Sequence, residues 1–170
     1  MQPIAEFKKV SFKQFLSDLK GTDFYDPEIN ETVIYMIWNN IKIPQRATIG
    51  SAGYDFFLPV SFSLEKRRAI TIPTGIRAEI QPGWMLMLVP RSGLGFKHGM
   101  RLMNTCGIID CDYAFAENEG HIMARITSSS NMCMQADDRF IQGVFLPYGL
   151  ARDDEAISKY RTGGFGSTGV

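Results

Sequence analysis

The chain of 170 residues is 45% hydrophobic, which is enough for one buried core within a single domain. Its 18 basic residues balance its 18 acidic residues, so there is no overall positive charge to drive non-specific binding to nucleic acid or to an anionic membrane. No stretch approaches the ~20 apolar residues that span a bilayer, and the first residues lack the apolar run of a signal peptide, so we expect a soluble protein of the cytoplasm.

The cysteines and histidines exclude two further classes of protein. Cys106, Cys111 and Cys133 form no CxxC pair and are odd in number, which favours a reducing compartment over a disulfide framework. His98 and His121 are the two histidines and belong to no Cys/His cluster. A structural zinc site or a zinc-dependent deaminase centre is therefore not expected.

The first predicted element is a helix over residues 11–20. Four apolar residues there recur at i, i+3, i+4 and i+7, the spacing of one helix face: Phe12, Phe15, Leu16 and Leu19. Ser11 and Gln14 form a capping-box pattern at its start, and Gly21 follows its expected end. We therefore expect a short amino-terminal helix.

The rest of the chain favours strands. Residues 33–38 are β-branched and aromatic, which predicts a strand. Residues 76–80 and 122–127 alternate apolar with polar side chains, as half-buried strands do. Residues 84–89 and 144–146 are apolar runs next to glycine or proline turns. Many short strands joined by such turns indicate an all-β sandwich or jelly roll.

Five short segments place small residues beside charged or polar groups, a composition suited to holding phosphates. They are SAGYD at 51–55, PRSGLG at 90–95, NTCGIIDCDY at 104–113, RFIQ at 139–142 and RTGGFGSTG at 161–169. Each segment alone is explained at least as well by an ordinary turn, a polar loop, an outward strand face or a glycine-rich tail. Their joint occurrence is the informative feature.

Within these segments, single side chains suit particular chemistry. Asp55 offers a hard oxygen to a magnesium ion. Arg91 brings a guanidinium to a loop that could hold an oligophosphate. Asp110 is a candidate base, and Tyr113 is a candidate platform for a sugar. Phe165 can stack on a base while the amides around it wrap a phosphate.

In this order, the five segments resemble the five motifs of the trimeric dUTPase family, and the match runs from about residue 41 to residue 170. The resemblance implies a dUTPase-like β jelly roll that forms a homotrimer with shared active sites. It implies Mg²⁺-dependent hydrolysis of dUTP to dUMP and pyrophosphate, which limits uracil incorporation into DNA and supplies dUMP for dTMP synthesis. We expect an amino-terminal extension with a short helix at 1–32, the β domain at 33–158, and a flexible tail at 159–170 that closes the site.

The resemblance also implies roles for individual residues. Asp110 matches the carboxylate that activates the water attacking the α-phosphorus, Asp55 matches the one that holds magnesium through water, and Tyr113 packs on the deoxyribose and excludes a 2′-hydroxyl. Uracil would be read by the hairpin residues Asn104, Gly107, Ile108 and Ile109. The phosphate loop and its neighbour would be Arg91, Ser92, Gly93 and Gln142. The tail would contribute Arg161, Phe165, Gly166 and Ser167.

Two features depart from the family pattern. Residues 114–119 intervene before Gly120 where the family has a shorter hairpin tip, and Arg161 stands one residue closer to Phe165 than the family's tail arginine does. The insertion and the extra amino-terminal segment are more typical of a phage or viral variant, whose compartment would be the host cell cytoplasm.

Two alternative functions stay open. The related dCTP deaminases, including bifunctional dCTP deaminase/dUTPases, share this fold, and residues 119–122 are similar to the segment around their catalytic glutamate; they carry an arginine where this chain has Phe96. The other alternative is a dUTPase-like regulatory module that binds another protein through the amino-terminal extension or the hairpin insertion.

Overall fold

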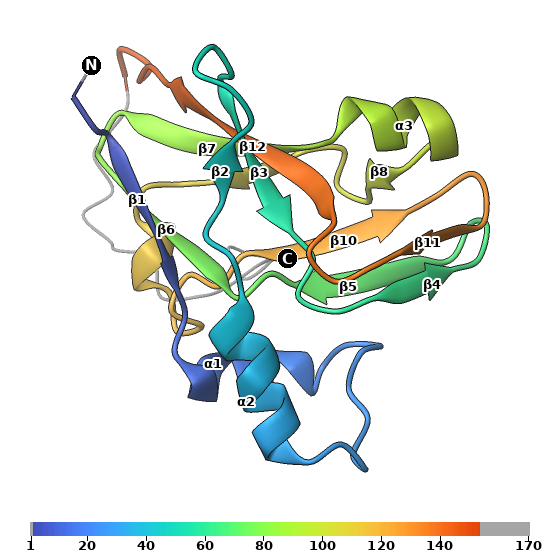
Figure 1. Ribbon diagram of the computed structural model, residues 1–170. Helices are drawn as coiled ribbons and strands as arrows, with labels where there is room; N and C mark the ends of the chain where they lie inside the picture. The colour runs from blue at the N-terminus through green and yellow to red at the C-terminus, as the bar shows by residue number, and fades with distance from the viewer. Residues whose placement is uncertain (1, 154–170) are drawn as a thin grey trace.

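Strands make up most of the regular structure in the computed structural model, which describes residues 2–153 (Figure 1). The elements follow one another as β1 Ala5–Lys9, α1 Phe12–Leu19, α2 Glu31–Asn40, β2 Gln45–Arg46, β3 Gly53–Phe57, β4 Phe62–Leu64, β5 Ala69–Pro73, β6 Ile76–Ile80, β7 Trp84–Pro90, α3 Ser92–His98, β8 Arg101–Leu102, β9 Gly107–Ile109, the 3-10 turn η1 Tyr113–Phe115, β10 Met123–Thr127, β11 Met132–Met134 and β12 Arg139–Pro147. The predicted tail lies outside the described residues.

The strands pair antiparallel in several small sheets. The largest has five strands in the order β2-β3-β12-β7-β9. A second sheet has the order β5-β10-β8, while β1 pairs with β6 and β11 with β4. Figure 1 shows these sheets packed over one another, with α1 and α2 gathered at one end. The predicted all-β class is confirmed.

The strands predicted from alternation are present with the expected faces inward. Ile76, Ala78 and Ile80 of β6 are buried, and so are Ala124 and Ile126 of β10. The two apolar runs form most of β7 and the middle of β12, which lie side by side at the centre of the large sheet. Every residue of these two runs is buried or half-buried, which fits their lack of polar positions.

Helix α1 forms where its spacing predicts. The Ser11 hydroxyl accepts a hydrogen bond from the Gln14 amide at 3.1 Å, and Phe15 and Leu19 are buried. The reciprocal half of the capping box is different: the Gln14 side chain donates to Asp18, and the Ser11 amide donates to Glu119. The start of α1 is therefore tied to a distant part of the chain.

The strand predicted at 33–38 is wrong, because these residues form α2. The Asn30 side chain caps this helix by accepting from the Thr32 amide at 2.8 Å. Four residues follow the period i, i+3, i+4 and i+7 and pack in or against the core: Ile34, Ile37, Trp38 and Ile41. β-branched composition is a weak guide to a strand, and burial of one helical face outweighs it here.

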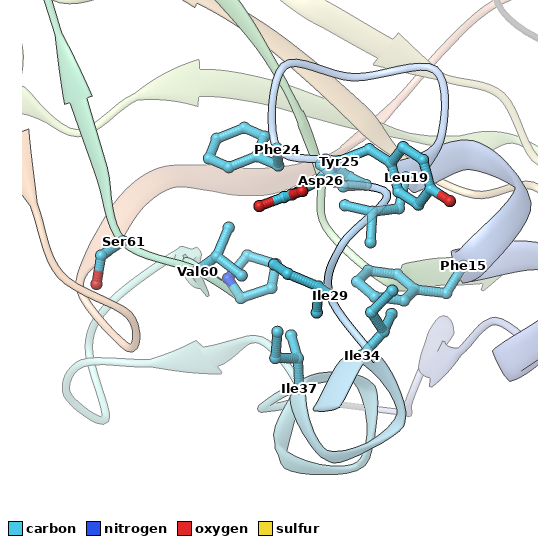
Figure 2. Close-up of a pocket in the computed structure, with 12 residues that line it drawn as sticks. Phe15, Leu19, Phe24, Tyr25, Asp26, Ile29, Ile34, Ile37, Val60 and Ser61 are labelled. Atoms are coloured by element: carbon cyan, nitrogen blue, oxygen red, sulfur yellow. The ribbon is translucent and has the colours of Figure 1, made fainter. Parts of the chain in front are cut away.

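An apolar pocket of about 220 Å³ lies between α1, α2 and the loop after β3. Figure 2 shows Phe15 and Leu19 on one side of this pocket and Ile37 and Val60 on the other. The pocket wall contains none of the residues that the sequence assigns to a nucleotide site. Its apolar lining does not suit a triphosphate, which needs cations and N–H donors.

The amino-terminal segment packs as part of the main core. All five residues of β1 pair with β6, and Val10, Phe15 and Leu19 belong to the same buried cluster as the strands. Residue 32 lies within α2. The division of the chain at residues 32 and 158 stays a prediction. Among residues 2–153, no helix is long and apolar enough to cross a membrane.

Candidate active site

A carboxylate held between two arginines lies near the end of the large sheet. Asp55 of β3 has a side chain only 9% exposed, and its Oδ1 lies 3.0 Å from Nε of Arg91. Its Oδ2 accepts a hydrogen bond from Nη1 of Arg139 at 3.1 Å. Asp55 is opposite Gln142 on β12, and Gln142 is opposite Val89 on β7. The sheet register thus brings together Asp55, Arg91 and Gln142, three of the predicted site residues.

Chain direction explains how Arg91 reaches this place. It follows β7 directly and begins α3, where its amide donates to the Phe140 carbonyl at 3.3 Å. Ser92 and Gly93 come next and are exposed to solvent. The guanidinium therefore points at a buried acid while the residues after it face outward, so this loop can present donors to an anion.

Glycine at position 53 leaves room for the Gln142 side chain. A Cβ built at Gly53 would lie 2.5 Å from Oε1 of Gln142, which is closer than non-bonded atoms approach. A side chain at position 53 would therefore displace the end of the Gln142 side chain from its present place beside β3.

Arg139 is a member of this cluster that the sequence did not identify as a site residue. It lies three residues before Gln142 in the fourth segment, and the register of β12 against β3 shifts between Arg139 and Ile141. The irregularity allows both Arg139 and Gln142 to lie next to β3. The presence of an arginine in the same short segment as Gln142 could have identified Arg139 as a site residue from the sequence.

The donor set around Asp55 bears on the magnesium expectation. Residues 2–153 contain no group of three or more His, Cys, Asp or Glu side chains arranged to hold a metal ion. Both Asp55 oxygens already face a guanidinium nitrogen. Such a carboxylate fits a magnesium ion that keeps its waters and takes most of its inner ligands from a substrate's phosphates.

The segment predicted to read the base forms a hairpin beside β7. Gly107 lies opposite Leu88, where a Cβ would come within 3.2 Å of two Leu88 carbons. Asn104 is exposed in the preceding turn, and Ile108 is 43% exposed. Ile109 is 1% exposed and part of the core. Its side chain is therefore structural, and only its backbone is available to a ligand.

Asp110 and Tyr113 follow this hairpin in different environments. Asp110 is exposed at the end of β9, and its carbonyl accepts from the Tyr113 amide at 3.1 Å. Tyr113 is 2% exposed, and its hydroxyl donates to the His121 carbonyl and accepts from the Asn118 side chain, both at 3.0 Å. The sugar-packing role of Tyr113 stays a prediction, and its ring is held firmly in place.

The two groups of predicted residues lie apart in one chain. Gln142 is beside Val89, whereas Ile109 is beside Leu86 further along β7. Strands β12 and β7 separate β9 from β3, which amounts to three strand spacings, or about 14 Å. A single subunit therefore does not bring Asp110 to the Asp55 cluster. The predicted tail residues Arg161, Phe165, Gly166 and Ser167 lie outside the described residues.

Comparison with known proteins finds one family. The family profile described as dUTPase matches residues 39–169. The deoxyuridine 5'-triphosphate nucleotidohydrolase of Lactococcus lactis is 40% identical over 134 residues, which cover 76% of this chain and 89% of that protein. The protein of the same name from Tolumonas auensis is 38% identical over 142 residues, covering 78% and 91%.

Solved structures agree with these matches. The dUTPase of Streptococcus mutans superimposes with a TM-score of 0.58 at 35% identity and covers 64% of this chain and 88% of its own. A mutant dUTPase of Staphylococcus bacteriophage 80alpha, solved with dUpNHpp, covers 99% of this chain and 100% of its own with a TM-score of 0.59. Its 19% identity is evidence of a shared fold alone. The predicted jelly-roll fold is confirmed.

Proposed function

Because the chain belongs to the dUTPase family, we propose that it hydrolyses dUTP to dUMP and pyrophosphate by attack of an activated water on the α-phosphorus. The observation that carries this proposal is the cluster of Asp55, Arg91 and Gln142, three motif residues that the register of β3, β12 and β7 places together. We assign a separate role in this reaction to each group of motif residues.

Arg91 binds the phosphates of the substrate. Its contact with Asp55 uses Nε, and a guanidinium carries five N–H donors in a planar fork. Asp55 therefore fixes the fork while terminal nitrogens donate to phosphate oxygens. Exposed Ser92 and Gly93 add a hydroxyl and an amide, and Gln142 lies near the α-phosphate.

Asp55 would hold a magnesium ion of the substrate complex through water. When bound, the ion neutralises charge on the phosphates and so favours attack at phosphorus. Asp55 also holds Arg91, so a single carboxylate would organise both cationic partners of the substrate.

Asp110 acts as the general base that takes a proton from the attacking water. A positioned base accelerates such a step by about 10²–10⁴-fold. The backbone of Gly107 and Ile109, with Asn104, reads the polar edge of uracil, and the hairpin leaves no room for a 5-methyl group. Tyr113 lies against the deoxyribose and rejects a 2′-hydroxyl.

A homotrimer brings the separate groups together. In this trimer Asp110 of one subunit meets the Asp55 cluster of another, an arrangement supported by the separation of β9 from β3 within one chain. Arg161, Phe165, Gly166 and Ser167 complete the site as a closing tail. This arrangement explains why the site residues are dispersed in a single chain.

The alternative functions receive less support. The deaminase alternative needs a Glu119 carboxylate that reaches the substrate, but Ser11 donates to both of its oxygens at 2.7 Å. The regulatory-module alternative stays a prediction. We therefore retain dUTP hydrolysis as the function.

Hydrolysis in ¹⁸O-labelled water tests the proposal. The protein, dUTP and Mg²⁺ should yield dUMP carrying the label and unlabelled pyrophosphate, because water attacks the α-phosphorus. Phosphorus NMR or mass spectrometry identifies the labelled product. Label in the pyrophosphate, or release of dUDP and inorganic phosphate, would contradict the proposed reaction.

A further inference from the structure

The amino-terminal segment, which precedes the family match, contacts the insertion at residues 114–119. Helix α1 of the amino-terminal segment lies against the insertion that follows Tyr113. At its start, the Ser11 amide and hydroxyl donate to Oε2 and Oε1 of Glu119, each at 2.7 Å. At its end, Asp18 Oδ2 lies 2.6 Å from Nδ1 of His121. Two polar contacts, one turn or more apart on the helix, therefore fix α1 to residues 119–121.

The Asp18–His121 contact is partly buried and has a defined direction. His121 is fully buried, and its Nε2 accepts a hydrogen bond from the Gly75 amide at 2.8 Å. The ring proton is therefore on Nδ1, which donates to Asp18. Gln14 also donates to Asp18 at 2.9 Å. Removing the Asp18 carboxylate would leave a buried donor without its partner, which is costly.

From His121 the contacts continue to the residues of the proposed site. The His121 carbonyl accepts from the Tyr113 hydroxyl at 3.0 Å, and Asn118 donates to the same hydroxyl. The Tyr113 amide in turn donates to the Asp110 carbonyl. Three hydrogen bonds, linked through His121 and Tyr113 themselves, therefore connect α1 to Tyr113 and to the backbone of Asp110.

The insertion has little freedom to move independently of Tyr113. Glu119 and Gly120 both have left-handed backbones, with φ of 56° and 70°. A Cβ at Gly120 would lie 2.7 Å from the Tyr113 carbonyl oxygen. The conformation at Glu119 is unfavourable for a residue with a side chain, and its two bonds to Ser11 offset that cost.

We propose that α1 positions the active site: Asp18, His121 and Glu119 are positioning residues that hold Tyr113 where it excludes a 2′-hydroxyl. The inference rests on the proposed function, since the contact of Tyr113 with the sugar belongs to it. Residues 1–32 are then part of the machinery that distinguishes dUTP from UTP, although none of them touches substrate.

The test compares three variants by their kcat/KM for dUTP and for UTP. Asp18→Ala removes the acceptor for His121, Asp18→Asn keeps one, and Asp23→Asn removes a charge from an exposed position of the same segment. At a temperature where all are folded, Asp18→Ala should lower the dUTP/UTP ratio by at least about tenfold, because a displacement of about 1 Å costs up to about 10²-fold. Asp18→Asn and Asp23→Asn should stay near the wild-type ratio. An unchanged ratio in folded Asp18→Ala overturns the inference.

A further variant, Glu119→Gly, and a second measurement, amide hydrogen exchange, test the same inference independently. Glu119→Gly removes the bonds to Ser11 at a left-handed position that glycine tolerates, so it serves if Asp18→Ala does not fold. Amide hydrogen exchange should become faster at residues 110–121 in both variants, and stay unchanged at 84–90 and in Asp23→Asn. Unchanged exchange at 110–121 overturns the positioning role. Hydrogen exchange can be measured without catalytic activity. Wild-type protein that does not hydrolyse dUTP would therefore contradict the proposed function, while the exchange measurement would still test whether α1 holds residues 110–121 in place.

Discussion

Arg91 Nε lies 3.0 Å from Asp55 Oδ1, so the guanidinium expected to bind phosphate is held by the carboxylate expected to face magnesium. Arg139 neutralises the other oxygen of the same carboxylate. The free protein thus keeps its phosphate-binding group oriented before substrate arrives. Such preorganisation lowers the entropy lost when the triphosphate binds.

Replacing Asp55 by Asn should destabilise the protein by about 1–2 kcal/mol, because two guanidinium groups lose a nearly buried charged partner. The matched control is Asp137→Asn, whose carboxylate pairs with Lys42 while both side chains are about half exposed. That change should cost at most about 1 kcal/mol. Urea unfolding measures both. Equal free energies of unfolding for the two variants would show that the contacts of Asp55 with Arg91 and Arg139 do not stabilise the fold.

Replacing Asp110 by Asn should lower kcat by at least about 10²-fold with little change in KM, because the base is lost while size and polarity are kept. Glu117→Gln removes a carboxylate from an exposed position nearby and should leave kcat close to the wild-type value. Steady-state assays of pyrophosphate release give both constants. Near-normal turnover of Asp110→Asn would remove Asp110 from the mechanism.

Stability should fall in acid partly through Asp18. Burial acts to raise the pKa of Asp18, but the hydrogen bonds from His121 and Gln14 outweigh it and lower that pKa below its ordinary value. A lowered carboxyl pKa stabilises the folded state above the ordinary value near ~4, and this contribution disappears as pH falls through the folded-state pKa. Thermal unfolding should show a smaller decrease from pH 6 to pH 3 in Asp18→Asn than in wild type or Asp23→Asn. Identical pH profiles would contradict this.

Subunit sharing predicts complementation between inactive chains. Arg91→Ala and Asp110→Asn damage residues that lie apart in one chain, because Arg91 follows Pro90 at the end of β7 whereas Asp110 follows Ile109, which pairs with Leu86 further back along β7. When the two chains are co-expressed in equal amounts, about one third of the sites in mixed trimers should contain an intact Arg91 and an intact Asp110 from different subunits. Activity above that of either variant alone, in a species that sediments as a trimer, is the expected result. Complete inactivity of the mixed trimer would place each site within one subunit.

The sequence predicts the strand regions well because their alternation reports directly on burial. Ile76–Ile80 and Met123–Thr127 are strands with the expected faces inward. Residues 33–38 mislead because β-branched side chains also occupy a helix when every third or fourth one is buried, as Ile34 and Ile41 are. Composition is a weaker signal than period there.

The sequence identifies which residues belong to the candidate site, but it does not predict how they contact one another. Asp55, Arg91 and Gln142 were identified from short motifs, yet their contact depends on the register of three strands far apart in sequence. The partnership of Asp18 with His121 spans 103 positions and leaves no local pattern. Contacts of this kind follow from tertiary packing, which no spacing rule encodes.

The most direct test of the account is the rate of pyrophosphate release from dUTP, dTTP, dCTP and UTP, each assayed with magnesium under the same conditions. We expect kcat/KM for dUTP to exceed the other three by orders of magnitude, because a hairpin that pairs with uracil's polar edge leaves buried groups unpaired with the wrong base. The product from dUTP should be dUMP. A comparable kcat/KM for dCTP, or a uridine nucleotide formed from dCTP, would contradict the account and favour a deaminase.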